Sequence, residues 1–316
     1  MKSADPLVSI IIPVFNRFDL AFRAINSVLS QTHTNWELFI IDDCSESVFE
    51  LSEDIVKQMD TRPIKVFRNE TNQGPGRSRQ TGLNNARGEY VCFLDSDDYY
   101  HPDFLKKSIN VHQKYSEIGA TYTTSKYIQT NEIRKNSDQT YKYLMPTLFE
   151  KKRPWPTCAL LWKKDCTASW KELRSNQDSL FEIDCSFINN RIQHIPEILC
   201  FIDKGTGQNT KDLVKDTASN LHRNYVTIYA LKNWKKIRVE NKDQQQLKEI
   251  IIKRVIYVSS KLAGNGIGLP ILNNSLQLFP LNWRIAVSLM LLSFMVFIPS
   301  GRIRNLSKRT IAALNH

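Results

Sequence analysis

The stretch "LVSIIIPVF", residues 7–15, is a nearly unbroken apolar run. Such a run is typical of a β-strand covered on both faces, because a strand with one face in water alternates apolar and polar residues. The next stretch, residues 20–32, repeats its apolar residues at helical spacing, and Asp19 before it is the expected N-cap. A buried strand followed by an amphipathic helix indicates a sheet with helices packed on its faces.

The alternation of strand-like and helix-like patterns continues along the chain. Three further apolar runs predict strands at residues 36–42, 64–68 and 90–94. Helical spacing predicts helices at residues 76–88, 104–115, 213–236 and 246–264. Gly88 is expected to cap the first of these helices, and residues 119–150 have no clear pattern. Helices between strands form βαβ units, so we predict an α/β fold with a parallel sheet flanked by helices.

The composition is that of a globular protein. Of the 316 residues, 41% are hydrophobic and 24% are charged, which argues against a disordered chain. The six cysteines lie far apart without a CxxC pair, and we interpret Cys92 and Cys185 as small buried hydrophobic residues. The N-terminal residues do not have the pattern of a signal peptide, so we expect a cytoplasmic protein.

The positive charge is concentrated in the last third of the chain. Residues 201–316 contain 18 Lys and Arg against 6 Asp and Glu, a net charge of +12, whereas residues 1–200 carry 25 against 26, or −1. A basic segment can bind nucleic acid or an anionic membrane surface. Here it adjoins the apolar stretch 285–298, so we expect a membrane surface as the partner and no nucleic acid.

The apolar stretch 285–298 can be interpreted in three ways. As a helix, its 14 residues would extend roughly 21 Å, short of the roughly 30 Å of a bilayer core. A buried core helix, an interfacial helix and a membrane span are the alternatives. Arg284 before the stretch and the basic residues from Arg302 onward favour the interfacial helix, because arginines can contact lipid headgroups.

Three acids follow the strand predicted at residues 90–94. Asp95, Asp97 and Asp98 surround Ser96, and carboxylates this close repel one another. A turn that caps the next helix needs only one of them. Two acids at positions i and i+2 can bind one divalent cation, and Mg²⁺ or Mn²⁺ prefers such oxygen ligands together with substrate phosphates. The spacing therefore favours a metal–diphosphate site over a capping turn.

Two other segments carry residues suited to a nucleotide. Asp42 and Asp43 end a predicted strand, and a carboxylate there can accept hydrogen bonds from a base or a ribose. The loop "NQGPGRSRQTG", residues 72–82, offers backbone N–H groups and the guanidinium of Arg79. It lacks the GK[ST] ending of a Walker loop, so an NTPase is disfavoured. The alternatives are an exposed turn and solvated arginines.

Together these motifs resemble a known family. The stretches "VLSQTHTNWELFIIDDCS", "NQGPGRSRQTGLNNARGEYVCFLDSDDYYHPDFL" and "SNQDSLFEID" are similar to those of family 2 nucleotide-sugar glycosyltransferases, over roughly residues 7–205. The resemblance implies a GT-A fold in residues 1–210, with a Rossmann-like, mostly parallel sheet flanked by helices. Its nucleotide-binding half would span about 1–104 and its acceptor half about 105–210, with residues 211–316 as a basic helical extension.

The resemblance also implies a role for individual residues. Asp97 matches the metal ligand of the family's DxD element, and Asp178 in "NQDSLF" matches its general base. The implied nucleotide-sugar-binding residues are Pro13, Phe15, Asp43, Arg79, Asp95 and Ser96. The stretch "FIDKGTGQNT" with Lys204 only loosely matches the loop that covers the diphosphate. Outside the resemblance, "KKRPWPT" is polar, and we expect Trp155 to be exposed and to stack on the acceptor sugar, whereas Trp162 and Trp170 are expected in the core.

The implied activity is inverting transfer of a sugar, glucose or galactose, from a UDP-sugar donor. The acceptor would be a lipid-linked, polyprenyl-diphosphate saccharide, and the product a β-glycoside of a bacterial surface polysaccharide such as O-antigen or capsule. The resemblance implies Mn²⁺ or Mg²⁺ as the cofactor and the cytoplasmic face of the inner membrane as the location. The alternatives are a non-catalytic nucleotide-binding scaffold of the same fold and a transferase with a soluble or protein acceptor.

Overall fold

The computed structural model describes residues 5–51, 53–59, 63–150, 153–173, 175–203 and 217–263. The strands are β1 Val8–Val14, β2 Trp36–Asp42, β3 Ile64–Arg68, β4 Tyr90–Phe93, β5 Tyr99–Tyr100, β6 Ala120–Tyr127, β7 Leu160–Lys163 and β8 Ile192–Ile202. The helices are α1 Phe18–Leu29, α2 Glu53–Met59, α3 Pro75–Asn85, α4 Phe104–Lys114, α5 Thr147–Glu150, α6 Gln177–Ile188, α7 Thr217–Asn233 and α8 Asn241–Ala263.

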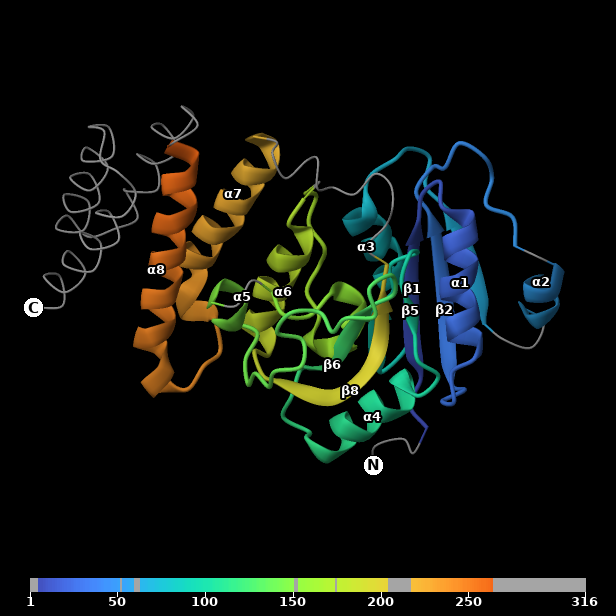
Figure 1. Cartoon of the computed structure of the whole chain (residues 1–316), viewed down its shortest axis with the longest axis horizontal. Helices are drawn as coiled ribbons and strands as arrows, with labels where there is room; N and C mark the ends of the chain where they lie inside the picture. The colour runs from blue at the N-terminus through green and yellow to red at the C-terminus, as the bar shows by residue number, and fades with distance from the viewer. Residues whose placement is uncertain are drawn as a thin grey trace, which may run out of the picture.

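One eight-stranded sheet organises the described residues, in the order β3-β2-β1-β4-β7-β6-β8-β5 (Figure 1). The first four strands are parallel, whereas β7 is antiparallel to both of its neighbours, β4 and β6. Strands β6 and β8 are again parallel, and β5 closes the edge in the antiparallel direction. The predicted α/β fold with a mostly parallel sheet flanked by helices is confirmed.

Strand β1 lies in the middle of the parallel half. All of its seven residues are buried, as its apolar run predicts. Val14 pairs with Asp42 of β2, and Ile11 pairs with Phe93 of β4. Because these strands are parallel, the loops that follow them leave the sheet at the same edge, where ligands of such sheets bind. The acids after β2 and β4 therefore lie along one edge.

Two predicted helix caps are wrong. Helix α1 begins at Phe18 with Arg17 at the N-cap, so Asp19 lies within the first turn instead. Helix α3 ends with Ala86 at its C-cap, and Gly88 lies beyond it. The Gly88 backbone N–H donates to Ser9 Oγ over 2.8 Å, and a Cβ at this position would collide with the backbone of β1. Glycine is needed at 88 for close approach to the strand.

The second half of the sheet follows no simple hydropathy pattern, so residues 119–150 were unassigned and β7 and β8 were not predicted. Strand β6 includes fully or almost fully buried hydroxyl residues, namely Thr121, Thr123, Thr124 and Ser125. Buried hydroxyls break the apolar run by which such a strand is recognised. All six cysteines are free, and Cys92 and Cys185 are buried as expected.

Helices α7 and α8 pack against each other and against the sheet domain (Figure 1). Tyr229 of α7 donates to Asp184 of α6 over 2.6 Å, and Lys171 contacts the same carboxylate at 2.8 Å. These helices match the two predicted beyond residue 210. Within the described part of the chain, no helix is long and apolar enough to cross a membrane. The stretch 285–298, Arg284 and the basic residues after it lie outside the described residues.

Candidate active site

The Asp43 carboxylate holds the loop that leads into α3. Its Oδ1 accepts hydrogen bonds from Asn69 Nδ2 at 2.8 Å and from the Gln73 N–H at 3.0 Å. Its Oδ2 accepts from the Gly74 N–H at 2.7 Å. A carboxylate has about four lone-pair sites, so one remains for a further donor. Asp43 is 3% exposed, which makes it first of all a support of this loop.

An exposed aromatic ring follows the end of β1. Phe15 is 44% exposed, whereas Pro13 is buried within β1 opposite Ile41. The backbone N–H of the next residue, Asn16, donates to Ser45 Oγ over 3.0 Å, which ties the ends of β1 and β2 together. Of Pro13 and Phe15, which were both predicted to bind the nucleotide-sugar, only Phe15 offers its ring to solvent.

Helix α3 is joined to α6 at its first turn. Gly74 precedes the helix with φ of 84°, a conformation that glycine adopts without strain. The Gly76 N–H then donates to Gln177 Oε1 over 3.1 Å, and a Cβ at Gly76 would collide with that oxygen. Gln177 thus satisfies one of the free N–H groups at the start of the helix. This junction aligns Arg79, one turn along α3, with Asp178.

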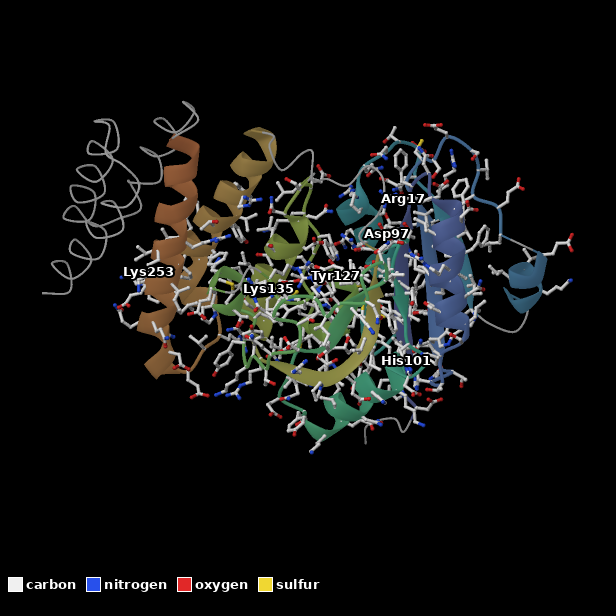
Figure 2. The ribbon with its side chains drawn as sticks, viewed as in Figure 1. Arg17, Asp97, His101, Tyr127, Lys135 and Lys253 are labelled. Atoms are coloured by element: carbon white, nitrogen blue, oxygen red, sulfur yellow. The ribbon has the colours of Figure 1, made fainter. Side chains whose placement is uncertain are left out.

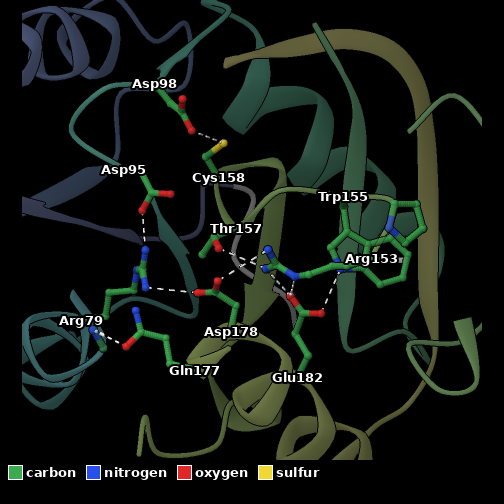
Figure 3. Close-up of polar contacts among 12 residues, drawn as sticks. Arg79, Asp95, Asp98, Arg153, Trp155, Thr157, Cys158, Gln177, Asp178 and Glu182 are labelled. Carbon is green, nitrogen blue, oxygen red and sulfur yellow. Dashed lines mark hydrogen bonds and ion pairs between the residues drawn. The ribbon is translucent and has the colours of Figure 1, made fainter. Parts of the chain in front are cut away.

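Arg79 links two of the predicted site acids (Figure 3). Its guanidinium is 4% exposed and forms ion pairs with Asp95 and, at 3.2 Å, with Asp178. It also lies over the ring of Trp170, 4.8 Å from the centroid. Burial by itself lowers the pKa of Arg79, but Asp95 and Asp178 outweigh burial and raise it. The cluster therefore contains a permanent cation that joins the loop after β4 to α6.

Asp97 forms its own contacts at the same edge (Figure 2). Arg17 Nη1 lies 2.6 Å from Asp97 Oδ2, and Arg23 donates to the Asp97 backbone oxygen at 2.5 Å. Burial and the charge of Asp95 raise the pKa of Asp97, although Arg17 opposes them. The Asp97 side chain is 22% exposed. The Asp97 carboxylate is thus repelled by the charge of Asp95 and paired with Arg17.

Asp98 and Ser96 are buried residues of the loop after β4. Asp98 is 3% exposed and accepts a hydrogen bond from Cys158 Sγ at 3.0 Å (Figure 3). It accepts another from the Asp203 N–H, also at 3.0 Å. Burial and the charges of Asp95 and Asp97 raise its pKa well above the usual range. Ser96 is also buried, at 8% exposure. The crowding of acids in the sequence thus corresponds to two accessible carboxylates and one that is internal.

Asp178 lies in the first turn of α6 with its side chain 30% exposed. Besides Arg79, it faces Arg153, whose Nη1 is 3.8 Å from Asp178 Oδ2. Burial by itself raises the pKa of Asp178, but Arg153 and Arg79 outweigh burial and lower it. The positive end of the helix dipole favours the same ionised form. Asp178 is therefore a carboxylate at neutral pH.

The prediction that Trp155 is exposed is wrong. The side chain is fully buried and packs on Tyr122 at a centroid distance of 4.9 Å. Its Nε1 donates to Glu182 Oε2 over 3.1 Å. The polar neighbours of Trp155 in the sequence suggested a surface position. In the structure, the ring is buried and its N–H is satisfied by the buried Glu182 carboxylate. Trp162 and Trp170 are buried, as predicted.

Three charged residues of the site were not predicted: Arg17, Arg153 and Glu182. Glu182 follows Asp178 by four residues, so both acids lie on one face of α6. Like charges at this spacing repel each other unless a cation lies between them. The spacing of the two acids was therefore a signal in the sequence for a cation beside α6. Within the residues that the structure describes, no three His, Cys, Asp or Glu side chains form a group that could hold a metal ion. Lys204 lies outside them.

Comparison with known proteins identifies the family. The model of glycosyl transferase family 2 matches residues 9–167, just over half of the chain, and the chain belongs to this family. A crystal structure of S. aureus TarS 1–349 in complex with UDP-GlcNAc superposes with a TM-score of 0.69 at 22% identity, covering 86% of this chain and 81% of that one. This likeness confirms the GT-A type of fold.

Several bacterial glycosyltransferases are similar over the N-terminal part. An uncharacterized glycosyltransferase of Rickettsia conorii is 39% identical over 132 residues, 42% of this chain and 21% of that protein. The putative colanic acid biosynthesis glycosyl transferase WcaA of Escherichia coli K12 is 36% identical over 129 residues, 41% and 46% of the two chains. WfgD of E. coli, a UDP-Glc:alpha-D-GlcNAc-diphosphoundecaprenol beta-1,3-glucosyltransferase, is 36% identical over 129 residues, 41% and 49%. The matched stretch spans less than half of each relative.

Proposed function

We propose that this glycosyltransferase moves a hexose, glucose or galactose, from a UDP-sugar to a lipid-linked saccharide with inversion, forming a β-glycosidic bond. The observation that carries the proposal is the position of Arg79. This buried cation binds Asp95, on the loop expected to hold the donor, and Asp178, the expected base, in a single ion-pair group. A donor bound at the first acid would then lie beside the second.

Asp178 would act as the general base. It would take the proton of an acceptor hydroxyl while that oxygen bonds to the anomeric carbon and the bond to the UDP oxygen breaks. One displacement without an enzyme nucleophile inverts the anomeric centre, so an α-linked donor gives a β-linked product. The lowered pKa of Asp178 keeps it ionised at neutral pH and ready to accept that proton.

Asp97 and Asp95 would hold Mn²⁺ or Mg²⁺ together with the diphosphate. Both offer partly exposed carboxylate oxygens, the ligands that these ions prefer, and both are paired with a guanidinium in the free protein. Such ions commonly take one or two carboxylates and complete their shell with substrate phosphates. The bound ion would neutralise charge on the departing UDP. Phe15 and Asp43 would contact the nucleotide base, and Arg79 and Ser96 would support the donor loop.

The donor and acceptor classes rest on the relatives. WfgD, as its name states, transfers glucose from UDP-Glc to a diphosphoundecaprenol-linked GlcNAc, and WcaA belongs to colanic acid biosynthesis. By analogy, we assign this chain to the assembly of a bacterial surface polysaccharide, O-antigen or capsule, at the cytoplasmic face of the inner membrane. The basic C-terminal third would contact the anionic lipid surface.

The test is transfer from radiolabelled UDP-glucose, UDP-galactose and UDP-GlcNAc to synthetic undecaprenyl-diphosphate-GlcNAc, with Mn²⁺ or with EDTA. We expect one hexose donor to be used, loss of transfer with EDTA, and a β-anomeric proton in the NMR spectrum of the product. Transfer that persists in EDTA would refute the metal dependence. An α-linked product would refute inversion.

The alternative is a nucleotide-binding scaffold without catalysis. It is disfavoured by the paired geometry of Asp178, because a scaffold has no need of a partly exposed carboxylate beside two arginines. Tight UDP binding without transfer to any of these acceptors, or to a soluble saccharide, would support the scaffold.

A further inference from the structure

Arg153 lies between the two acids of α6 (Figure 3). Its Nε and Nη2 donate to Glu182 Oε1 at 2.9 and 2.5 Å, and its Nη2 also donates to Thr157 Oγ1 at 3.1 Å. Its remaining nitrogen, Nη1, faces Asp178 Oδ2 at 3.8 Å. One planar guanidinium therefore uses two of its nitrogens on internal partners and turns the third toward the expected base.

The partners of Arg153 are buried, so its orientation is fixed. Glu182 is 1% exposed, and its second oxygen accepts from Trp155 Nε1 at 3.1 Å. The backbone oxygen of Arg153 accepts from Arg134 Nη1 at 3.0 Å. A buried carboxylate is stable only when its oxygens are satisfied and its charge is paired. Arg153 pairs the charge of Glu182 and satisfies Oε1, and Trp155 satisfies Oε2. The Arg153 side chain is itself only 19% exposed.

We propose that Arg153, held by Glu182 and Trp155, is a positioning residue for Asp178. It fixes the direction of the Asp178 carboxylate from the side opposite Arg79 and maintains it as the ionised base. This inference rests on the proposed function, since it assigns Asp178 the role of base. Arg153 and Trp155, from the segment before β7, and Glu182 of α6 would thus help to determine the rate of sugar transfer.

The charged groups around Asp178 agree with this role. Arg79 of α3 and Arg153 are the cations that face it, Thr157 contributes a hydroxyl, and Asp95 reaches Asp178 only through Arg79. Of the two arginines, Arg153 contributes more to lowering the pKa of Asp178. Arg79 also forms an ion pair with Asp95, whereas the ion pairs of Arg153 in the described structure are with Asp178 and Glu182, and Asp95 acts on Arg153 only through its charge. Changes at Arg153 should therefore alter the base and leave donor binding intact.

The test uses three variants of the full chain. Arg153→Lys keeps the positive charge, but lysine lacks the planar guanidinium that contacts Glu182, Thr157 and Asp178 at the same time. The double variant Arg153→Gln/Glu182→Gln removes the cation without leaving an unpaired buried acid. Arg191→Gln is the matched control, since Arg191 is 41% exposed and pairs with Glu240, away from the cluster. Circular dichroism melting of each variant comes first.

We expect Arg153→Lys and the double variant to lose kcat by roughly 10- to 100-fold, the cost of a displaced catalytic group, with the donor KM unchanged. The acidic limb of the kcat profile should move to higher pH in the double variant and stay in place in Arg153→Lys. Wild-type kcat in Arg153→Lys, or an unshifted limb in a folded double variant, would overturn the proposal. If the double variant does not fold, the kcat of Arg153→Lys alone tests the proposal, and a wild-type value would overturn it.

A readout without turnover separates this inference from the proposed function. Asp178 can be titrated by ¹³C NMR of carboxyl-labelled aspartate, with Asp178→Asn to assign the resonance. Its pKa should rise in the double variant and remain at the wild-type value in Arg191→Gln. If the wild-type chain transfers no sugar, the proposed function fails, whereas this titration still tests whether Arg153 controls Asp178.

Discussion

At the scale of the residue, a few buried charges determine the geometry of the site. Arg79 and Arg153 each face Asp178, and both guanidinium groups are mostly removed from solvent. Interactions between charges are stronger where water is excluded, so these arginines can fix the base more firmly than exposed ion pairs could. The reactivity expected of Asp178 is therefore a property of its neighbours as much as of the carboxylate itself.

Trp155 offers a test of the corrected assignment. Its ring is buried, and its N–H donates to the Glu182 carboxylate. Trp155→Phe should lower the free energy of unfolding by about 2 kcal/mol, since a hydrogen bond to a buried charge is lost. In steady-state assays, the acceptor KM should not change, while kcat falls with the loss of support for Arg153. A raised acceptor KM with unchanged stability would restore the direct role at the acceptor.

Part of the site could be predicted from local sequence. Asp95 and Asp178 come from short motifs, and the structure brings both to one arginine. Arg153 and Glu182 could not be paired in advance, because they are 29 residues apart and meet only when α6 packs beside the segment before β7. Trp155 was misplaced for a related reason, since local polarity does not reveal a distant buried partner.

At the scale of the element, the junction of α3 with α6 aligns the site. At the first turn of α3 the Gly76 N–H donates a hydrogen bond to the Gln177 side chain, and one turn further along the Arg79–Asp178 ion pair joins the same two helices. Strands β1, β2 and β4 are predicted by their apolar runs because all of their residues are buried, whereas helix α2 was not predicted. The hydroxyl-rich β6 was not, since its buried polar residues are satisfied only within the finished sheet.

The junction makes a specific prediction for a double-mutant cycle. Gly76→Ala and Gln177→Ala should each destabilise the chain, the first by collision and the second by leaving the Gly76 N–H without its partner. The double variant should be no less stable than Gly76→Ala, because the added methyl then occupies the space of the removed amide. Urea unfolding of the four proteins measures the coupling. Additive losses would show that the two residues act independently.

At the scale of the whole molecule, buried polar groups join neighbouring strands in the second half of the sheet. His194 of β8 stacks on Tyr122 of β6 at 4.7 Å and contacts the hydroxyls of Thr124 and Thr140. Burial lowers the pKa of His194, although Asp138 and a backbone hydrogen bond oppose it. The folded protein therefore binds a proton at this ring less readily than the unfolded chain does.

The consequence is a loss of stability in acid. The unfolded histidine has a pKa of about 6.5, so stability should decline as the pH falls below that value toward the lower pKa of the folded state. His194→Gln should show a smaller decline between neutral pH and mild acid in urea unfolding. His101→Gln, at a ring that is 41% exposed, is the matched control. An unchanged pH dependence in His194→Gln would contradict this account.

The most direct measurement of the central claim is the rate of transfer by Asp178→Asn beside its affinity for UDP. Asparagine keeps the shape of the side chain but cannot accept the proton of an attacking hydroxyl. We predict that kcat for transfer from the preferred UDP-hexose falls by about 10²-fold or more, as expected for the loss of a general base. The dissociation constant of UDP with Mn²⁺, measured by calorimetry, should stay at the wild-type value. Transfer at the wild-type rate in Asp178→Asn would contradict the account.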